Sequence, residues 1–353
     1  MSIKKTFAIN GFGRIGRTTF RVWWDHYQQD LDLVAINTSG SMSLEGWVHL
    51  LKHDTNYGNF DPGISFQEHQ SNKDVTDEDP VLGVITIQDK QITVTAQRDP
   101  NKLPWQKLGV ELVLEATGVF LKEENASQHL TAGAKKVLLT APAKGGNVST
   151  SVLGVNQFDA EANIFSNASC TTNCVAPVVH VLNEKIGVEK ATLTTIHAYT
   201  DTQNLLDNSD KKDLRRARAA AENLIPTSTG AAKATTKIIP QLEGLFDGLA
   251  VRVPIPTGSL SDIVFITSKD TSVEEVNSIL TEAAQSDQYQ GSLAVSNEHL
   301  VSSDIVGRNE SSIVDLELTQ VIGGNLVKVV VWYDNEWGYC ARLLDQLALI
   351  PLD

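Results

Sequence analysis

The sequence predicts an α/β protein with two parts: a doubly wound parallel sheet, then an α+β region with a mostly antiparallel sheet. Three observations support this prediction. A glycine-rich turn follows the first strand-like segment, strand and helix patterns alternate through the first half, and long segments rich in β-branched residues fill the second half. Alternating strands and helices are typical of a parallel sheet covered on both faces.

The glycine-rich turn predicts a dinucleotide site. A β-prone run at residues 6–10 leads into Gly-x-Gly-x-x-Gly, then an amphipathic stretch to about Tyr27 and a second apolar run at residues 33–36. In such a unit Gly11 makes the turn, Gly13 admits the pyrophosphate and Gly16 allows close packing of helix on strand. The phosphates would lie at the helix N-terminus. We therefore expect a Rossmann domain.

The remaining elements of the first half follow from periodicity and turn residues. The acidic stretch from Asp61 to Pro80 is expected to be a solvated surface loop. Glu123 to Ala132 is expected to form a helix closed by Gly133. Strands are expected at Val84–Ile87, Gln91–Ala96, Leu112–Glu115 and Lys136–Leu139.

The second half changes character after an expected helix from Thr172 to Glu184, which stops at Gly187. A long aperiodic loop covers Asp201 to Pro226, and loops of this length are usually functional. A helix is expected at Ala231–Ile239, and a last helix at Gly338–Leu349 could pack back on the first domain. Alternating segments predict half-buried strands at Ala191–Tyr199, Leu249–Val253, Ser261–Ser268 and Leu326–Tyr333.

Cys170 and His197 are the candidate catalytic pair. Cys170 opens the expected helix, and the unpaired N–H groups of a helix N-terminus favour a thiolate. A histidine 27 residues later could complete a Cys/His pair, a common way to activate such a nucleophile. Taken alone, such a cysteine is more often a small buried hydrophobe, and such a histidine is more often packed within its strand.

Composition bounds the function further. The chain has 353 residues, a formal net charge of −14, 41% hydrophobic and 20% charged residues, and three cysteines. An acidic chain does not favour nucleic acid or an anionic membrane as the main partner. An odd, low cysteine count indicates a reducing compartment, and no metal-ligand spacing is visible. No apolar run approaches a membrane span, and no leader is expected before the first strand, so we expect a cytoplasmic protein.

Five motifs together resemble the phosphorylating glyceraldehyde-3-phosphate dehydrogenases over nearly the whole chain. They are Asn-Gly-Phe-Gly-Arg-Ile-Gly-Arg at 10–17, Ser-Cys-Thr-Thr-Asn-Cys at 169–174, Asp-Leu-Arg-Arg-Ala-Arg-Ala-Ala at 213–220, Pro-Thr-Ser-Thr-Gly-Ala-Ala-Lys at 226–233 and Trp-Tyr-Asp-Asn-Glu-Trp-Gly-Tyr at 332–339. The resemblance implies a dinucleotide-binding domain at 1–169, completed by a C-terminal helix at 336–353. It also implies a catalytic domain at 170–335 and a homotetramer.

The resemblance also implies the chemistry and its residues. Cys170 would attack the aldehyde of D-glyceraldehyde 3-phosphate, His197 would act as base, and inorganic phosphate would release 1,3-bisphosphoglycerate from the thioester. Substrate and phosphate would be bound by Ser169, Thr171, Thr200, Arg216, Thr229, Gly230 and Arg252. The cofactor, NAD or NADP, would be bound by Gly11, Phe12, Gly13, Arg14, Ile15, Gly16, Asn37, Thr38, Ser39, Arg98, Thr117, Gly118, Thr140, Ser209 and Asn335.

Two positions depart from the NAD-specific members of that family. Those members have Asp where this chain has Thr38, and they tend to have Pro where it has Ser209. A carboxylate at the end of the second strand bonds the ribose 2′-OH and repels a 2′-phosphate. Because neither position carries one, we expect the chain to use both NAD and NADP.

Three other functions are compatible with parts of the sequence. An erythrose-4-phosphate dehydrogenase hydrolyses the thioester, but Ser169, Thr171, Thr229 and Arg216 favour phosphate as the attacking group. A nucleic-acid-binding protein that uses the dinucleotide groove is disfavoured by the net charge. A cysteine hydrolase would leave the glycine-rich unit unexplained.

Overall fold

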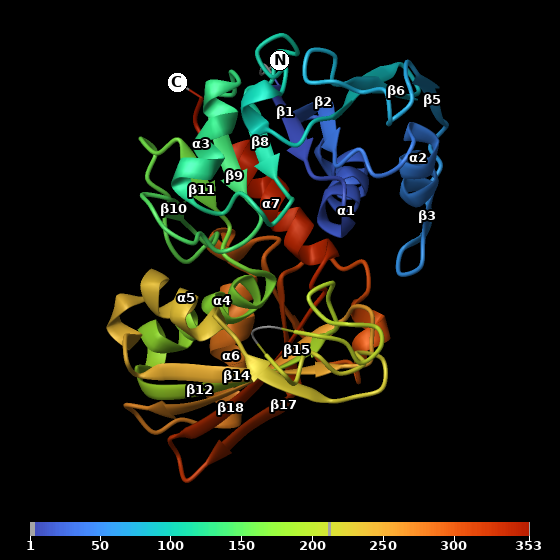
Figure 1. The fold of residues 1–353 in the computed structure, drawn as a ribbon. Helices are drawn as coiled ribbons and strands as arrows, with labels where there is room; N and C mark the ends of the chain where they lie inside the picture. Colours follow the sequence, from blue (N-terminus) through green and yellow to red (C-terminus); the bar gives the residue numbers. More distant parts are fainter. Residues whose placement is uncertain (1–3, 211–212, 353) are drawn as a thin grey trace. The chain divides into compact units, whose positions relative to one another are not determined.

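The computed structural model describes residues 4–210 and 213–352. The described chain forms two compact units. The first unit comprises residues up to Thr150, Phe158–Ala168 and the residues from Leu343 on, and the second comprises Ser151–Gln157 and Ser169–Arg342. Each unit has its own sheet (Figure 1).

The first unit is built on a nine-stranded sheet in the order β10-β11-β9-β8-β1-β2-β7-β6-β5. The pairs from β10 to β7 are parallel, and the strand order reverses at β1. In an open sheet of this kind, ligands bind outside the carboxyl ends of the strands at the reversal point. The strands are β1 Lys5–Asn10, β2 Leu31–Thr38, β5 Ile64–Glu68, β6 Val81–Ile87, β7 Lys90–Ala96, β8 Leu112–Glu115, β9 Lys136–Leu139, β10 Ser149–Thr150 and β11 Ile164–Ser166.

Near-continuous apolar runs explain the centre of this sheet. All four residues of both β8 and β9 are buried, as is usual where a parallel sheet is covered on both faces. The helices of the unit are α1 Arg14–Val22, continued by a π-helical turn η1 Trp23–Tyr27, then α2 Leu44–Lys52, the 3-10 turn η2 Pro100–Lys102 and α3 Glu123–Thr131. A two-stranded pair, β3 His53–Asp54 and β4 Gly58–Asn59, follows α2.

Two expectations for the first unit were incomplete. The strands β5, β6 and β7 pair antiparallel, so the parallel sheet carries an antiparallel edge. The predicted acidic loop contains the edge strand β5, whose last four residues are exposed. This strand was missed because only Ile64 of its five residues is buried, which leaves no apolar pattern to read.

The second unit has a seven-stranded sheet in the order β13-β14-β12-β15-β18-β17-β16. Four of its neighbouring pairs are antiparallel, while β12 with β14 and β16 with β17 are parallel. The predicted mostly antiparallel sheet is therefore confirmed. The strands are β12 Val188–Ala198, β13 Ile225–Ser228, β14 Phe246–Val253, β15 Ser259–Thr267, β16 Leu293–Ser296, β17 Ser312–Ile322 and β18 Leu326–Tyr333.

Alternating burial along these strands places one face of the sheet against the helices. In β15 every second residue is buried, and Ile263 and Phe265 join a core that also contains residues of the helices. Figure 1 shows α4, α5 and α6 beside this sheet. The helices and short turns are α4 Cys170–Ile186, α5 Ala231–Ile238, α6 Val273–Ala284, η3 Pro240–Leu242, η4 Asp287–Tyr289 and η5 Ser302–Ile305.

The last helix, α7 Trp337–Leu349, begins in the second unit and ends in the first. Its C-terminal part is bonded to the first unit: Tyr27 donates to Asp345 at 2.7 Å, and the Lys5 ammonium donates to the carbonyl of Ile350 at 2.8 Å. None of the described helices is both long enough and apolar enough to span a membrane.

Candidate active site

Cys170 is the first residue of α4, and the local sequence explains why the helix begins there. Ala168 has φ +54°, a left-handed conformation that redirects the chain. Ser169 is the N-cap, and its hydroxyl accepts from the backbone N–H of Thr172 at 3.2 Å. The helix ends at Gly187, whose φ of +72° suits glycine. The thiol therefore lies at a capped helix N-terminus.

His197 reaches this thiol from the neighbouring sheet. It lies near the end of β12, directly opposite Arg252 of the parallel strand β14. Its Nε2 is 3.5 Å from the sulfur of Cys170, and the imidazole is 4% exposed. The predicted pair is thus within contact distance although its members are 27 residues apart.

The second ring nitrogen of His197, Nδ1, has two polar neighbours that bear on the tautomer of the ring. Nδ1 lies 2.7 Å from the carbonyl oxygen of Ala198, and Nη1 of Arg252 lies 2.8 Å from the same Nδ1. A guanidinium N–H only donates, so Arg252 bonds to Nδ1 when that nitrogen carries no proton. When Nδ1 carries the ring proton it donates to Ala198 instead, and Nε2 then presents a lone pair to the sulfur. This tautomer is the one that a general base requires. The adjacent guanidinium opposes a second proton on the ring.

Burial and Arg252 set the protonation of the pair. Burial raises the pKa of the Cys170 thiol, and Arg252 and Thr171 oppose that rise. Burial and then Arg252 lower the pKa of His197 to about 3, although its bond to Ala198 acts in the opposite direction. Burial thus favours the neutral form of both groups, and His197 Nε2 lies within reach of the thiol. The sequence shows the helix end that favours a thiolate, but it does not show the burial that opposes one.

A buried hydroxyl network centred on Tyr333 contacts the pair, and the sequence analysis gave Tyr333 no role. The Tyr333 hydroxyl lies 2.9 Å from both Thr171 Oγ1 and Thr195 Oγ1, and its ring packs edge-on against His197 with centroids 5.9 Å apart. Thr171 is 5% exposed, so its hydroxyl points into the unit. The available signal was Tyr333 itself, which lies in the motif at 332–339 and ends β18, but no sequence pattern gives it a chemical role.

The other predicted phosphate-binding residues of the second unit lie on several elements. Thr229 and Gly230 lie at the N-terminus of α5, where Thr229 accepts from the N–H of Ala231 at 3.2 Å. Arg216 is half-buried and donates through Nε to Thr227 at 2.9 Å. The hydroxyl of Thr200 lies 2.9 Å from that of Thr202. Burial, and to a smaller extent the charge of Arg216, lower the pKa of Arg252.

Two predicted cofactor residues also lie in the second unit. Asn335 is 6% exposed, and its carbonyl accepts from Ser259 at 2.8 Å and from Thr257 at 3.4 Å. These bonds fix the orientation of the Asn335 amide, with its oxygen toward Ser259 and Thr257 and its nitrogen directed away from them. Ser209 is exposed in the long loop, and its N–H donates to Asn208 at 2.7 Å.

The glycine turn in the first unit fits a dinucleotide by its shape. Gly11 has φ +98°, and a Cβ there would lie 2.8 Å from the N of Thr117. A Cβ on Gly16 would lie 2.1 Å from the carbonyl oxygen of Gly11, so helix and turn need both glycines. A Cβ on Gly13 would meet no atom within 4 Å. The turn is therefore closed toward the protein and open at Gly13, where a pyrophosphate could approach the backbone.

The non-glycine residues of the turn have structural partners. Phe12 is buried and packs edge-on against Phe20 and Trp47. Arg14 forms an ion pair with Asp54. Ile15 is half-buried in the first turn of α1. The phenylalanine side chain therefore belongs to the core.

The end of β2 is arranged differently from the sequence-based expectation. Thr38 is 1% exposed, and its hydroxyl donates to the carbonyl of Thr95 at 3.2 Å. Ser39 is exposed and lies 2.9 Å from Ser41 Oγ. Part of the acidic stretch lies beside this loop, since the Asn72 amide donates to the carbonyl of Gly40 at 2.9 Å. The stretch is thus anchored next to the end of β2.

The remaining cofactor residues surround the same sheet edge. Asn37 is 4% exposed and bonds the backbone of Gln97 through both ends of its amide. Thr117 and the exposed Gly118 follow β8. Thr140 follows β9 and donates its N–H to the carbonyl of Glu115 at 3.1 Å, and Arg98 is exposed beyond β7. Asn37, Thr117 and Thr140 therefore have polar partners within the unit.

Comparison with known proteins shows which family the chain resembles. Residues 5–123 match the family model for the glyceraldehyde 3-phosphate dehydrogenase NAD binding domain, and residues 169–335 match that for the C-terminal domain. The chain is 48% identical over 343 residues to a glyceraldehyde-3-phosphate dehydrogenase of Zymomonas mobilis, covering 97% of each chain. It is 46% identical over 346 residues to glyceraldehyde-3-phosphate dehydrogenase 2 of Synechocystis, again covering 97% of each. A chloroplastic glyceraldehyde-3-phosphate dehydrogenase A of Chlamydomonas reinhardtii is 48% identical over 96% of this chain and 86% of its own.

Proposed function

Because this chain belongs to the glyceraldehyde-3-phosphate dehydrogenase family, we propose that it oxidises D-glyceraldehyde 3-phosphate to 1,3-bisphosphoglycerate with NAD⁺ or NADP⁺ and inorganic phosphate. The observation that carries this proposal is the 3.5 Å contact between the Cys170 sulfur and His197 Nε2 at the N-terminus of α4. The names of the relatives above favour this substrate over erythrose 4-phosphate.

The proposed chemistry assigns each proton to a named atom. His197 Nε2 takes the thiol proton as the Cys170 sulfur attacks the aldehyde carbon, and it returns that proton to the new oxyanion to give a thiohemiacetal. His197 then removes the hydroxyl proton as the hydride departs, which leaves a thioester. Attack by phosphate expels the sulfur, and the proton on His197 returns to it. The nicotinamide, when bound, accepts the hydride.

Arg252 is the proposed substrate-phosphate ligand. Its Nη1 lies 2.8 Å from His197 Nδ1, so the guanidinium is directly beside the catalytic pair. A planar guanidinium binds a phosphate through two parallel hydrogen bonds. Attraction of Arg252 toward a substrate phosphate would leave His197 Nδ1 free to donate to Ala198 alone. Thr200 is the proposed neighbour of Arg252 at the substrate phosphate. The attacking phosphate is proposed to bind at Ser169, Thr171, Arg216, Thr229 and Gly230.

The glycine turn between β1 and α1 is the proposed pyrophosphate site, since Gly13 leaves its backbone open. Asn335 is the proposed partner of the nicotinamide carboxamide, and the remaining cofactor residues predicted from sequence keep their proposed roles. Neither Thr38 nor Ser39 carries a negative charge, which supports use of both dinucleotides. The family model that matches residues 5–123 is an NAD binding domain, and a chloroplastic form is among the relatives.

We also propose that the protein is a cytoplasmic homotetramer with its functional domain boundaries at 169/170 and 335/336. Support for self-association comes from exposed leucines in the long loop of the second unit. Leu205, Leu206, Leu214 and Leu224 are 77%, 75%, 82% and 69% exposed. Exposed apolar patches on soluble proteins commonly mark interfaces. Sedimentation at micromolar concentration tests the tetramer, and a monomer at that concentration would contradict it.

The decisive experiment is an initial-rate assay with D-glyceraldehyde 3-phosphate, with phosphate present or absent and with NAD⁺ or NADP⁺. We expect reduction of either dinucleotide to depend on phosphate. The matched substrate is erythrose 4-phosphate without phosphate. A faster reaction under that condition would replace the proposed activity with the hydrolytic one.

A further inference from the structure

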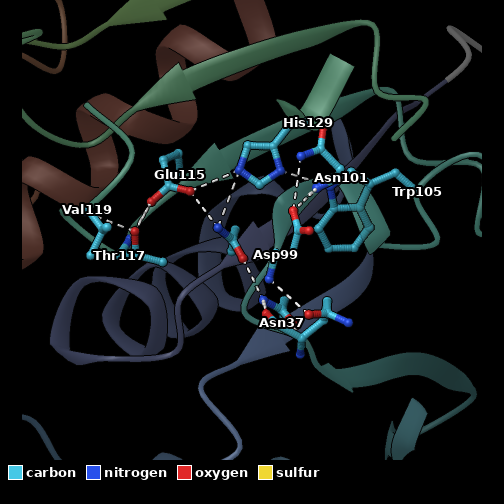
Figure 2. A network of polar contacts seen from close by, with 10 residues as sticks. Asn37, Asp99, Asn101, Trp105, Glu115, Thr117, Val119 and His129 are labelled. Carbon is cyan, nitrogen blue, oxygen red and sulfur yellow. Dashed lines mark hydrogen bonds and ion pairs between the residues drawn. The ribbon is translucent and has the colours of Figure 1, made fainter. Parts of the chain in front are cut away.

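A buried carboxylate beneath the glycine turn has no role in the chemistry proposed above. Glu115 is the last residue of β8 and is completely buried, as is His129 of α3. Figure 2 shows His129 between Trp105 and Glu115, with Thr117 on the other side of the carboxylate. A carboxylate kept fully from water needs several hydrogen-bond donors to offset the lost hydration.

Four hydrogen bonds provide those partners. Oε1 of Glu115 accepts from the backbone N–H of Thr117 at 2.8 Å and from its hydroxyl. Oε2 accepts from the amide of Asn10 and from His129 Nε2, which lies 3.0 Å away. A group that receives donors on both oxygens has the hydrogen-bonding pattern of an ionised carboxylate. Glu115 therefore joins the residue before the glycine turn to the loop that follows β8.

The orientation of His129 is fixed from its far side. Trp105 Nε1 carries a hydrogen and donates to His129 Nδ1 at 3.1 Å, so Nδ1 is an acceptor. The ring hydrogen therefore lies on Nε2 and is donated to Glu115. His129 acts as a neutral donor, and the tryptophan maintains the tautomer that this contact requires.

The hydrogen bonds continue across the sheet on the other side of Asn10. The Asn37 amide donates to Asn10 Oδ1 at 2.7 Å, and Thr95 Oγ1 and the N–H of Gln97 each donate to Asn37 Oδ1 at 2.9 Å. The network thus joins the carboxyl ends of β8, β1, β2 and β7, which are consecutive in the sheet. This is the edge along which a dinucleotide lies in such a fold.

The network also bears directly on the glycine turn. Gly11 follows Asn10 and is pressed against the backbone of Ala116 and Thr117 so closely that no Cβ fits. Because Glu115 holds both Asn10 and Thr117, it fixes the two loops against each other before any ligand arrives. An apolar side chain at 115 could fill the space and could not accept from both loops.

We propose that Glu115, with His129 as its fixed donor, is a positioning residue that holds the β1 turn and the β8 loop in the geometry that binds the dinucleotide. This inference rests on the proposed function only for the identity of the ligand. Glu115 does not touch the cofactor; it raises the fraction of the protein whose loops are ready to bind. The apparent dissociation constant scales inversely with that fraction. Because the contacts lie away from the 2′ position, NAD and NADP should be affected alike.

The test is Glu115→Gln, measured by direct titration with NAD⁺ and with NADP⁺. A glutamine places its amide N–H against a donor on one side, so one loop must move. We expect the dissociation constants for both dinucleotides to rise by the same factor, ~10-fold if the ready fraction falls to a tenth. The rate at saturating cofactor should change less than twofold, so KM rises while kcat stays.

The matched control is Glu111→Gln, at the residue directly before β8 and so beyond its opposite end. Glu111 accepts from the backbone N–H of Thr6 at 3.1 Å and pairs with Lys135 at 2.9 Å, so it also joins β8 to β1. It lies at the amino edge, away from the glycine turn. We expect Glu111→Gln to lower the melting temperature without changing cofactor affinity. Equal effects of the two variants on affinity would overturn the proposal, because they would show a general loss of stability.

A second pair of variants keeps the test valid if Glu115→Gln does not fold. His129→Leu removes the donor to Glu115, and His129→Gln restores a donor N–H near the place of Nε2. Weaker binding by the leucine variant and recovery by the glutamine variant support the proposal; equal affinities in the two overturn it. If the wild-type protein binds neither dinucleotide, the proposed function fails instead.

Discussion

At the scale of single residues, the reactive sulfur depends on two neighbours with opposite effects. Burial raises the pKa of Cys170, whereas the charge of Arg252 lowers it. The same guanidinium lowers the pKa of His197, so one residue favours the thiolate and keeps the base neutral. Reactivity is therefore a property of three side chains from α4, β12 and β14.

The first prediction concerns the nucleophile. Cys170→Ser should abolish dehydrogenase activity and leave dinucleotide binding intact, because a hydroxyl beside a neutral imidazole is a far weaker nucleophile. Initial rates and a cofactor titration measure both effects. The matched control is Cys174→Ala, four residues along the same helix and fully buried, which should keep activity. Iodoacetate should label Cys170 before Cys174 or Cys340, and the reverse order would contradict the assignment.

The second prediction concerns pH. Arg252→Met removes the charge that lowers the pKa of Cys170 and of His197, so both values should rise. The thiolate fraction at a given pH then falls, and the midpoint of Cys170 alkylation should move to higher pH. Alkylation rates measured from pH 6 to 11 provide the profile. A midpoint that stays in place or moves downward would show that Arg252 does not influence the thiol.

The third prediction concerns cofactor choice. Thr38→Asp places a carboxylate at the end of β2, where it should repel a 2′-phosphate by a few kcal/mol. NADP should lose about tenfold or more in kcat/KM relative to NAD. Thr38→Val is the control for loss of the hydroxyl bond to Thr95, and it should affect both cofactors equally. If the wild type already rejects NADP by about a thousandfold, the discrimination comes from elsewhere, and the anchored acidic stretch is the first place to examine.

At the scale of elements, the N-terminus of α4 combines stability and function. Ser169 caps the helix through the N–H of Thr172 at 3.2 Å, and Ser272 caps α6 through the N–H of Glu275 at the same distance. The two caps have the same chemistry, and only the first borders the nucleophile.

The fourth prediction uses that pair. Ser169→Ala and Ser272→Ala should each lower the free energy of unfolding by about 1 kcal/mol. Only Ser169→Ala should also slow Cys170 alkylation, because it loosens the turn that carries the thiol. Chemical denaturation and alkylation rates are the measurements. Equal alkylation rates in the two variants would mean that the cap has no part in presenting the sulfur.

At the scale of the whole molecule, ligand and stability should be linked. The proposed dinucleotide site lies in the first unit, and a ligand that binds only the folded state stabilises it. At about 100 times its dissociation constant, NAD⁺ should add ~2.7 kcal/mol to the stability of that unit. The fifth prediction is a rise of about 5–10 °C in the melting temperature, measured by calorimetry on Cys170→Ser to prevent turnover. Nicotinamide alone is the control and should have little effect; no shift with NAD⁺ would contradict the cofactor site.

The sequence by itself determined the elements whose patterns are local. The positions of β8 and β9 and the stop of α4 at Gly187 follow from apolar runs and from glycine's access to positive φ. The glycine-rich turn and the cysteine at a helix start were also predicted from the local sequence. The resemblance of ordered motifs then predicted the family, which the comparisons confirmed.

Only the tertiary structure decided how side chains distant in the sequence share partners. It brought Arg252 within hydrogen-bond distance of His197, and Tyr333 within hydrogen-bond distance of Thr171. It also placed Glu115 where it accepts from both Asn10 and Thr117. It also turned Thr38 inward and made part of the acidic stretch an edge strand. Each of these outcomes depends on burial and on hydrogen bonds between separate strands, and no local pattern encodes which residue across a sheet satisfies a buried polar group.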